Sequence, residues 1–196
     1  MDLPPLPQYV SRGGEKLQAA LDDIPFDPTG LVCADLGCHA GGFTDCLLQH
    51  GASKVFAVDT CYGTLAWKLR KDPRVVVMER TNAMHVELPS PVDLVTIDVG
   101  WTPQARILPQ AASLLSVGGH VISLIKPQYE AEKSVLVDGV IPDDRLDEVL
   151  AAVRSGIERI GWLIHQIVPS PIRGHGGNRE YLALLSRTPQ PGPVAG

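Results

Sequence analysis

The 196-residue chain lacks the features that mark membrane, secreted and zinc-binding proteins. No apolar run approaches the roughly 18 residues that a membrane-spanning helix needs. The N-terminus, MDLPPLPQ, has no basic segment leading into an apolar one, which excludes a secretory signal there. The four cysteines form no Cys-x-x-Cys pair, which favours free thiols in a reducing cytoplasm and no metal site. We therefore expect a soluble cytoplasmic protein with no membrane partner.

Basic residues are also few. The formal net charge is −5, which argues mildly against a protein coated with nucleic acid. The hydrophobic share of 44% and the charged share of 20% are those of an ordinary globular domain with a full core.

Short apolar runs alternate with helical stretches along the chain. The apolar runs are LVCADLG, KVFAVDT, RVVVMER, VDLVTIDVG and HVISLIK, and their continuous apolar character predicts parallel strands covered on both faces. Helices are expected at 13–21, 43–50, 63–70, 104–115 and 143–160. Segments 162–172 and 179–186 predict an antiparallel hairpin. The pattern predicts an α/β, Rossmann-like fold: a mostly parallel twisted sheet with helices on both faces, over residues 9–187, and flexible segments at 1–8 and 188–196.

The stretch VCADLGCHAGGFTD lies between the first strand and its helix, where open α/β sheets bind ligands. It has neither the GxGxxG pattern nor the lysine of a phosphate-binding loop, and Asp35 and Asp45 would repel a pyrophosphate. These features favour S-adenosyl-L-methionine, whose cationic end suits an acidic neighbour, over a plain strand–helix turn. Asp59 ends the second strand and is expected to accept hydrogen bonds from ribose hydroxyls. The expected cofactor contacts are Asp35, Gly37, Cys38, His39, Gly41, Gly42, Phe43, Asp59, Thr60, Asn82 and Asp98.

Four further charged residues are expected to meet near this loop. Asp98 ends the fourth strand and Lys126 ends the fifth, so both side chains should reach the same crevice. Lys126 follows a buried apolar run and precedes a proline, which predicts an ammonium group that is partly desolvated and held by carboxylates. Glu180 opens the final strand, and Lys16 lies on the helix before the sheet. Taken singly, each is more often a solvated surface charge.

Several blocks of the sequence resemble the TlyA-type branch of the FtsJ-like methyltransferases. They are YVSRGGEKLQAAL, DLGCHAGGFTDCLLQHGASKVFAVD, WKLRKDPRVVVMERTN, LIKPQYE and SPIRGHGGNREYLALL. The resemblance implies an S-adenosyl-L-methionine-dependent enzyme that methylates ribose 2′-hydroxyls of ribosomal RNA; some members are also called hemolysins. It implies that the family's Lys-Asp-Lys-Glu tetrad corresponds to Lys16, Asp98, Lys126 and Glu180.

The chain departs from the family at several points. Cys38, His39 and Ala40 replace the small residues usual in the glycine loop, and GWTPQ follows where Ser-Phe-Ile-Ser is usual. The given sequence begins just after the point where the family's N-terminal RNA-binding domain usually ends, so we expect RNA to be bound by a local patch: Arg12, Lys16, Arg173 and Arg179. Trp101 either stacks on a base or packs. Two alternatives stay open: methylation of a small molecule, which the net charge favours, and a non-catalytic binding or hemolysin-like protein.

Overall fold

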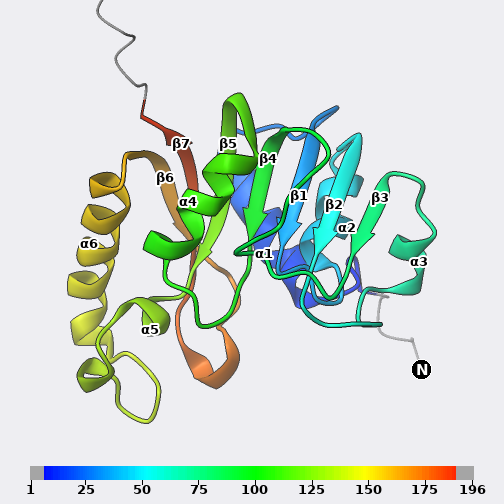
Figure 1. Ribbon diagram of the computed structural model, residues 1–196. Helices are drawn as coiled ribbons and strands as arrows, with labels where there is room; N and C mark the ends of the chain where they lie inside the picture. Colours follow the sequence, from blue (N-terminus) through cyan, green and yellow to red (C-terminus); the bar gives the residue numbers. More distant parts are fainter. Residues whose placement is uncertain (1–6, 189–196) are drawn as a thin grey trace, which may run out of the picture.

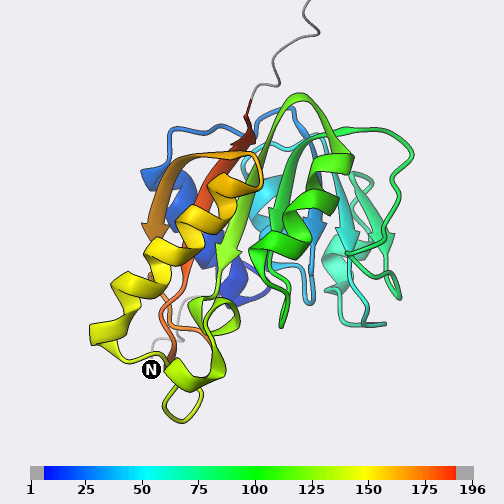
Figure 2. The ribbon, with the colours of Figure 1, turned by 60° about the vertical axis from the view of Figure 1, so that its left-hand side comes forward.

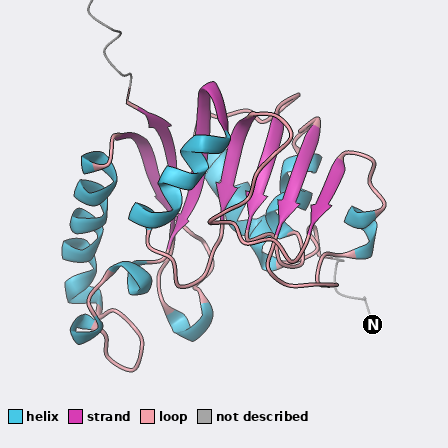
Figure 3. Cartoon of the chain, viewed as in Figure 1, coloured by secondary structure: helices cyan, strands magenta, loops and turns pink. Residues whose placement is uncertain are grey.

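Seven strands form one twisted sheet in the order β3-β2-β1-β4-β5-β7-β6 (Figures 1 and 3). The computed structural model describes residues 7–188. The strands are β1 (Val32–Leu36), β2 (Lys54–Val58), β3 (Val75–Met78), β4 (Val92–Ile97), β5 (Leu115–Ile125), β6 (Trp162–Pro169) and β7 (Tyr181–Arg187). The helices are α1 (Arg12–Asp23), α2 (Gly42–Gln49), α3 (Trp67–Arg70), α4 (Gln104–Leu114), α5 (Pro127–Glu130) and α6 (Asp143–Arg159), with short 3₁₀ turns at Lys133–Val135 and His175–Gly177.

The first five strands pair in parallel, whereas β7 is antiparallel to both β5 and β6. This arrangement confirms the predicted Rossmann-like sheet and its late hairpin. The chain moves outward from β1 to β2 and β3 and then returns to place β4 on the other side of β1. The loops that leave β1 and β4 therefore diverge at the carboxyl edge of the sheet, where α/β folds bind their ligands.

Two apolar layers attach the helices to the sheet. On one face, α4 and α6 cover a cluster that includes Ile107, Val121 and Ile157, and the two helices lie side by side (Figure 2). On the other face, α1 and α2 cover a second cluster that includes Leu17 and Leu47. The helices thus cover both faces of the sheet, as predicted. They leave uncovered the carboxyl edge of the parallel strands, where a ligand site can form.

Some local expectations are corrected. The helix expected at 63–70 is only one turn, Trp67–Arg70, because Gly63 has a left-handed φ of 76° and Ala66 has a ψ of 140°, neither of which is helical. Strand β5 begins at Leu115, five residues before the predicted start at 120. The flexible segments expected at 1–8 and 188–196 lie outside the described residues, apart from 7, 8 and 188. No helix within residues 7–188 is long and apolar enough to cross a membrane.

Candidate active site

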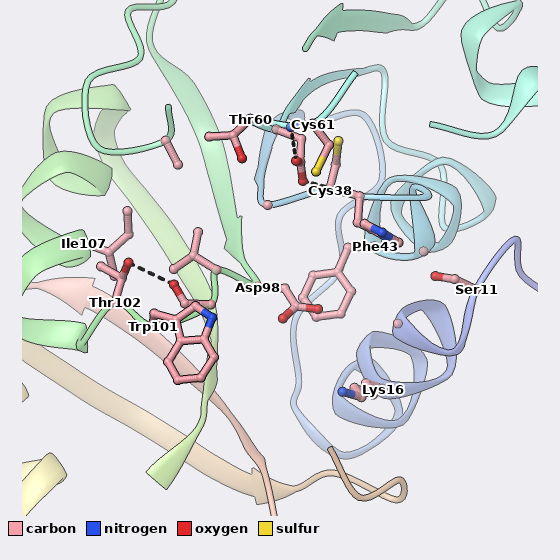
Figure 4. Close-up of a pocket in the computed structure, with 18 of the residues that line it drawn as sticks. Ser11, Lys16, Cys38, Phe43, Thr60, Cys61, Asp98, Trp101, Thr102 and Ile107 are labelled. Atoms are coloured by element: carbon pink, nitrogen blue, oxygen red, sulfur yellow. Dashed lines mark hydrogen bonds between the residues drawn. The ribbon is translucent and has the colours of Figure 1, made fainter. Parts of the chain in front are cut away.

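A cavity of about 790 Å³ opens at the carboxyl edge of the parallel strands. Loops following β1, β2, β3 and β4 form its walls, and the start of α1 and the loop before β7 complete its rim. Its volume lies in the range of small-molecule sites. Figure 4 shows Lys16 on α1 and Asp98 after β4 at the same opening, with Phe43, Cys38 and Trp101 around it. The strand ends predicted to form a ligand site therefore do form a cavity.

The glycine loop passes close to the end of β4. Gly37 has a φ of 87°, and a Cβ built there would lie 2.5 Å from the carbonyl oxygen of Asp98. A side chain at this position would therefore push the two loops apart. Gly42 starts α2 against α1, where a Cβ would lie 2.7 Å from the backbone nitrogen of Gly14. These two glycines allow the close backbone approach that shapes one wall of the cavity.

Most of the expected cofactor contacts line this cavity, but two do not. The lining includes Gly37, Cys38, His39, Gly42, Phe43, Asp59, Thr60, Asn82 and Asp98. Gly41 lies outside the lining, against the side chains of Leu65 and Leu69. Asp35, expected to contact the ligand, has no exposed surface and also lies outside the lining.

Asp35 is a buried residue that forms hydrogen bonds with other parts of the protein. Its carboxylate accepts hydrogen bonds from the Thr44 backbone N–H (2.9 Å), the Thr44 hydroxyl (2.7 Å) and the Thr96 hydroxyl (3.2 Å). It thereby ties the start of α2 to β4, behind the glycine loop. Asp45 also turns away from the cavity, because it pairs with Lys68 at 2.8 Å and accepts the N–H of Val10. The predicted repulsion of a pyrophosphate by these two residues is therefore not supported by their positions.

Burial of Asp35 should make stability depend on pH. Burial raises the pKa of Asp35 to about 7, from 3.8. Between about pH 4 and about pH 7 the folded state therefore keeps a proton on Asp35 that the unfolded state has lost. The contribution of this proton to the free energy of unfolding is lost as pH rises from about 4 to about 7. The loss is about 1.4 kcal/mol for each unit of the pKa difference. Urea unfolding of the wild type and of Asp35→Asn at pH 5 and pH 8 measures this contribution.

The Asp35→Asn protein should lose less stability than the wild type between these two pH values. Asp147→Asn, an exposed change on α6, is the control and should behave like the wild type. Equal pH dependence in all three proteins would contradict the assignment of this titration to Asp35.

Asp59 lies at the cavity with its carboxylate fixed by the backbone. One oxygen accepts the N–H of His39 and the other accepts the N–H of Cys61, both at 2.8 Å. These two bonds hold the carboxylate between the loops that follow β1 and β2. Each oxygen retains a lone pair for a further donor, as the hydroxyls of a ribose would supply.

The four charged residues of the predicted tetrad form two ion pairs. Lys16 Nζ lies 2.5 Å from Glu180 Oε2, and Lys126 Nζ lies 2.6 Å from Asp98 Oδ1. Lys126 also donates to the carbonyl oxygen of Val99 at 3.1 Å. The exposed fractions of the Lys16 and Lys126 side chains are only 12% and 15%, so both ammonium groups are partly desolvated. Lys16 and Asp98 line the cavity, with their partners behind them.

Only part of the predicted basic patch gathers at this site. Arg12 and Arg173 line the cavity together with Lys16. Arg179 does not, because its guanidinium lies 3.3 Å from Asp143 at the start of α6 and borders a separate small hollow. The patch that faces the cavity therefore holds two arginines and not three.

Several lining residues were not expected from the sequence. The segment after β3 contributes Thr81, Ala83 and Met84. Its position could have been inferred, because β3 is the next parallel strand and ends at the same edge. Trp101 borders the cavity with 84% of its surface exposed, and its ring lies 4.7 Å from that of Tyr129. Nothing in the sequence pattern singled out Tyr129.

The sequence matches a family model and is similar to several known proteins. The family model for FtsJ-like methyltransferases matches residues 9–187. The chain is 42% identical over 187 residues to YqxC of Bacillus subtilis, a candidate rRNA methyltransferase, covering 91% of this chain and 66% of that protein. It is 40% identical over 183 residues to the 16S/23S rRNA (cytidine-2′-O)-methyltransferase TlyA of Mycobacterium tuberculosis, covering 90% and 68%.

A solved structure shows the same relationship. A candidate hemolysin from Streptococcus thermophilus is 36% identical, with a TM-score of 0.89, over 96% of this chain and 70% of that one. The chain spans about two thirds of the length of the curated relatives it matches.

Proposed function

The chain belongs to the FtsJ-like methyltransferase family, and from this premise we propose that it methylates a ribose 2′-hydroxyl of ribosomal RNA. Membership confirms the family expected from the sequence and, with it, S-adenosyl-L-methionine as the cofactor. The observation that carries the substrate proposal is the meeting of two lysine–carboxylate pairs at one cavity, at the end where Arg12 and Arg173 also lie.

The cavity suits the cofactor chemically. The backbone around Gly37 and the carboxylate of Asp59 would hold its amino-acid end and its ribose, respectively. Asp59 adds a negative charge to this part of the lining, whereas the charge of Asp98 is balanced by Lys126. When bound, S-adenosyl-L-methionine supplies a methyl group already activated on a sulfonium, so the protein has to align the acceptor and stabilise charge.

The tetrad would orient the acceptor hydroxyl. An ammonium group has three N–H donors, and Lys126 spends two of them on Asp98 and Val99. The third can donate to the ribose oxygen, and it would stabilise the partial negative charge that this oxygen gains as its proton leaves for a water molecule. The bond from the methyl group to sulfur would break as the bond to this oxygen forms. The ion pair with Asp98 holds the Lys126 side chain in place. The Lys16–Glu180 pair would position the same ribose from the opposite wall.

Exposed aromatic rings near cations support RNA as the substrate. Arg80 lies over the ring of Tyr62 at 4.3 Å, on segments adjoining the cavity, and Lys71 lies over the ring of Trp67 at 4.8 Å. Trp101 offers a third exposed ring. Stacking on bases together with a few cations is a common way to hold unpaired nucleotides. It also suits a chain whose net charge of −5 limits the number of phosphate contacts.

The test of the proposal is transfer of a labelled methyl group. We expect label in ribosomal subunits or free ribosomal RNA, at a ribose that becomes resistant to alkaline cleavage on its 3′ side. Label in a small-molecule extract and in no RNA would favour the alternative of a small-molecule methyltransferase, with which the acidic net charge is compatible.

Removing the two arginines at the cavity should weaken RNA binding. With Arg12→Ala and Arg173→Ala combined, the slope of log affinity against log salt should fall by about 1.4 to 1.8, because each phosphate contact contributes about 0.7 on a single strand and about 0.9 on a duplex. Binding of a ribosomal RNA fragment across a salt series measures this slope. The control is Arg154→Ala with Arg159→Ala, two exposed arginines on α6. An unchanged slope in the first double variant would exclude this patch from RNA binding.

A further inference from the structure

Helix α5 contacts the loop between β4 and α4 at successive residues. Lys126, just before the helix, donates to Asp98 and to the Val99 carbonyl. At the end of the helix, the carboxylate of Glu130 accepts the backbone N–H of Gln104, the first residue of α4, at 2.8 Å. The loop 98–104, which carries Asp98 into the cavity, is therefore fastened to α5 at both of its ends.

Tyr129 supplies the contact in the middle of this loop. Its ring lies 4.7 Å from the ring of Trp101, with 34° between the two planes. Trp101 has a φ of 59°, in the left-handed region, which is unfavourable for a bulky residue and needs support from its surroundings. The Trp101 side chain is 84% exposed, and Tyr129 is the aromatic residue found against it within residues 7–188.

The ring of Tyr129 also faces the catalytic lysine proposed above. Lys126 Nζ lies 5.9 Å from the centre of that ring, within the range of a cation–π contact. Among the described residues, no hydrogen bond engages the Tyr129 hydroxyl, so its contacts are made by the ring. One half-buried side chain thus touches both the exposed Trp101 and the ammonium of Lys126.

We propose that Tyr129 is a positioning residue for methyl transfer, whose ring holds Trp101 and Lys126 in a fixed relation at the substrate end of the cavity. A nucleotide resting on Trp101 is then presented to Lys126 at a set distance. The proposal rests on the proposed function for its effect on catalysis. The contact of the Tyr129 ring with the Trp101 side chain does not depend on any substrate.

The first measurement is therefore made without RNA. In a Trp67→Phe background, Trp101 is the exposed tryptophan and Trp162 is buried, so the fraction of emission quenched by acrylamide reports on Trp101. Tyr129→Leu should raise the quenching rate and lower the anisotropy of this fraction, because the supporting ring is lost. Tyr129→Phe keeps the ring and should match the parent. Equal values for the phenylalanine and leucine variants would overturn the proposal.

The second measurement uses the native tryptophans and the RNA that the wild type methylates. Tyr129→Leu should raise KM for RNA and lower kcat by about tenfold, since small displacements of aligned groups slow transfer strongly. Cofactor affinity should stay at the wild-type value, and Tyr129→Phe should restore both kinetic constants. A leucine variant whose thermal midpoint and cofactor affinity fall together with kcat would show a merely structural role and overturn the proposal.

The two measurements separate this proposal from the proposed function. If the wild type methylated RNA and Tyr129→Leu retained its kcat and KM, the positioning role would be wrong and the function would stand. If the wild type methylated no RNA, the function would fail, and the fluorescence of Trp101 would alone decide whether Tyr129 holds it.

Discussion

Replacing Lys126 with alanine is expected to lower the rate of methyl transfer by about two to four orders of magnitude. The ammonium group is the cation that contacts Asp98 at the end of β4, and its third donor is the one available to the acceptor oxygen. The alanine variant loses this donor and leaves Asp98 without its partner. Affinity for S-adenosyl-L-methionine should change little, because the cofactor contacts proposed above are the backbone around Gly37 and the carboxylate of Asp59. Single-turnover methylation and calorimetry with the cofactor measure the two quantities separately.

A matched pair of variants identifies the ammonium as the cause. Lys126→Met keeps an unbranched side chain of nearly the same length but removes its charge, and should be as inactive as the alanine variant. Lys133→Ala removes an exposed lysine from the 3₁₀ turn Lys133–Val135 and should remain active. A Lys126→Met protein with the wild-type rate on its RNA would show that the charge takes no part in transfer.

The parallel strands were predictable because burial on both faces leaves a clear sequence pattern. The run around Val55–Val58 is apolar at every position and fully buried in the structure. The start of β5 is different: Val117 and Gly118 are exposed, and the pairing with β4 shifts between Val92 and Leu94. The register with β4 passes from Leu115 to His120, so the residues between them interrupt the buried apolar pattern and the strand was predicted to begin too late.

The approach of Lys126 to Asp98 could be anticipated because β4 and β5 are neighbouring parallel strands that end at one edge of the sheet. The catalytic role of the tetrad stays a prediction. The errors have another origin, which is long-range pairing. Arg179 was expected at the cavity, but Asp143 from the start of α6 holds it elsewhere. Asp35 ends a strand like Asp98 does, yet the two threonine hydroxyls that enclose it could not be inferred from spacing. The stacking of Tyr129 on Trp101 likewise depends on how two loops meet.

Replacing Asp59 with alanine is expected to weaken binding of S-adenosyl-L-methionine by about a hundredfold. Hydrogen bonds to a charged group contribute about 1.5–3 kcal/mol each, and about 1.4 kcal/mol corresponds to a factor of ten. The carboxylate is held between the N–H groups of His39 and Cys61, so its orientation toward a ribose is set before the cofactor arrives. Removing it deletes the acceptor and also the two hydrogen bonds through which it joins the loops.

Calorimetry with the cofactor checks this expectation, and three variants make it specific. Asp59→Asn keeps the shape but replaces one acceptor with an N–H donor, and it should fall between the wild type and Asp59→Ala. Asp147→Ala, on the exposed face of α6, should bind as the wild type does. Thermal unfolding of Asp59→Ala without ligand establishes that the variant is folded. If Asp59→Ala bound the cofactor as tightly as the wild type, or if the wild type preferred NAD, the carboxylate would have no part in holding this ribose, and the cofactor would have to lie elsewhere in the cavity.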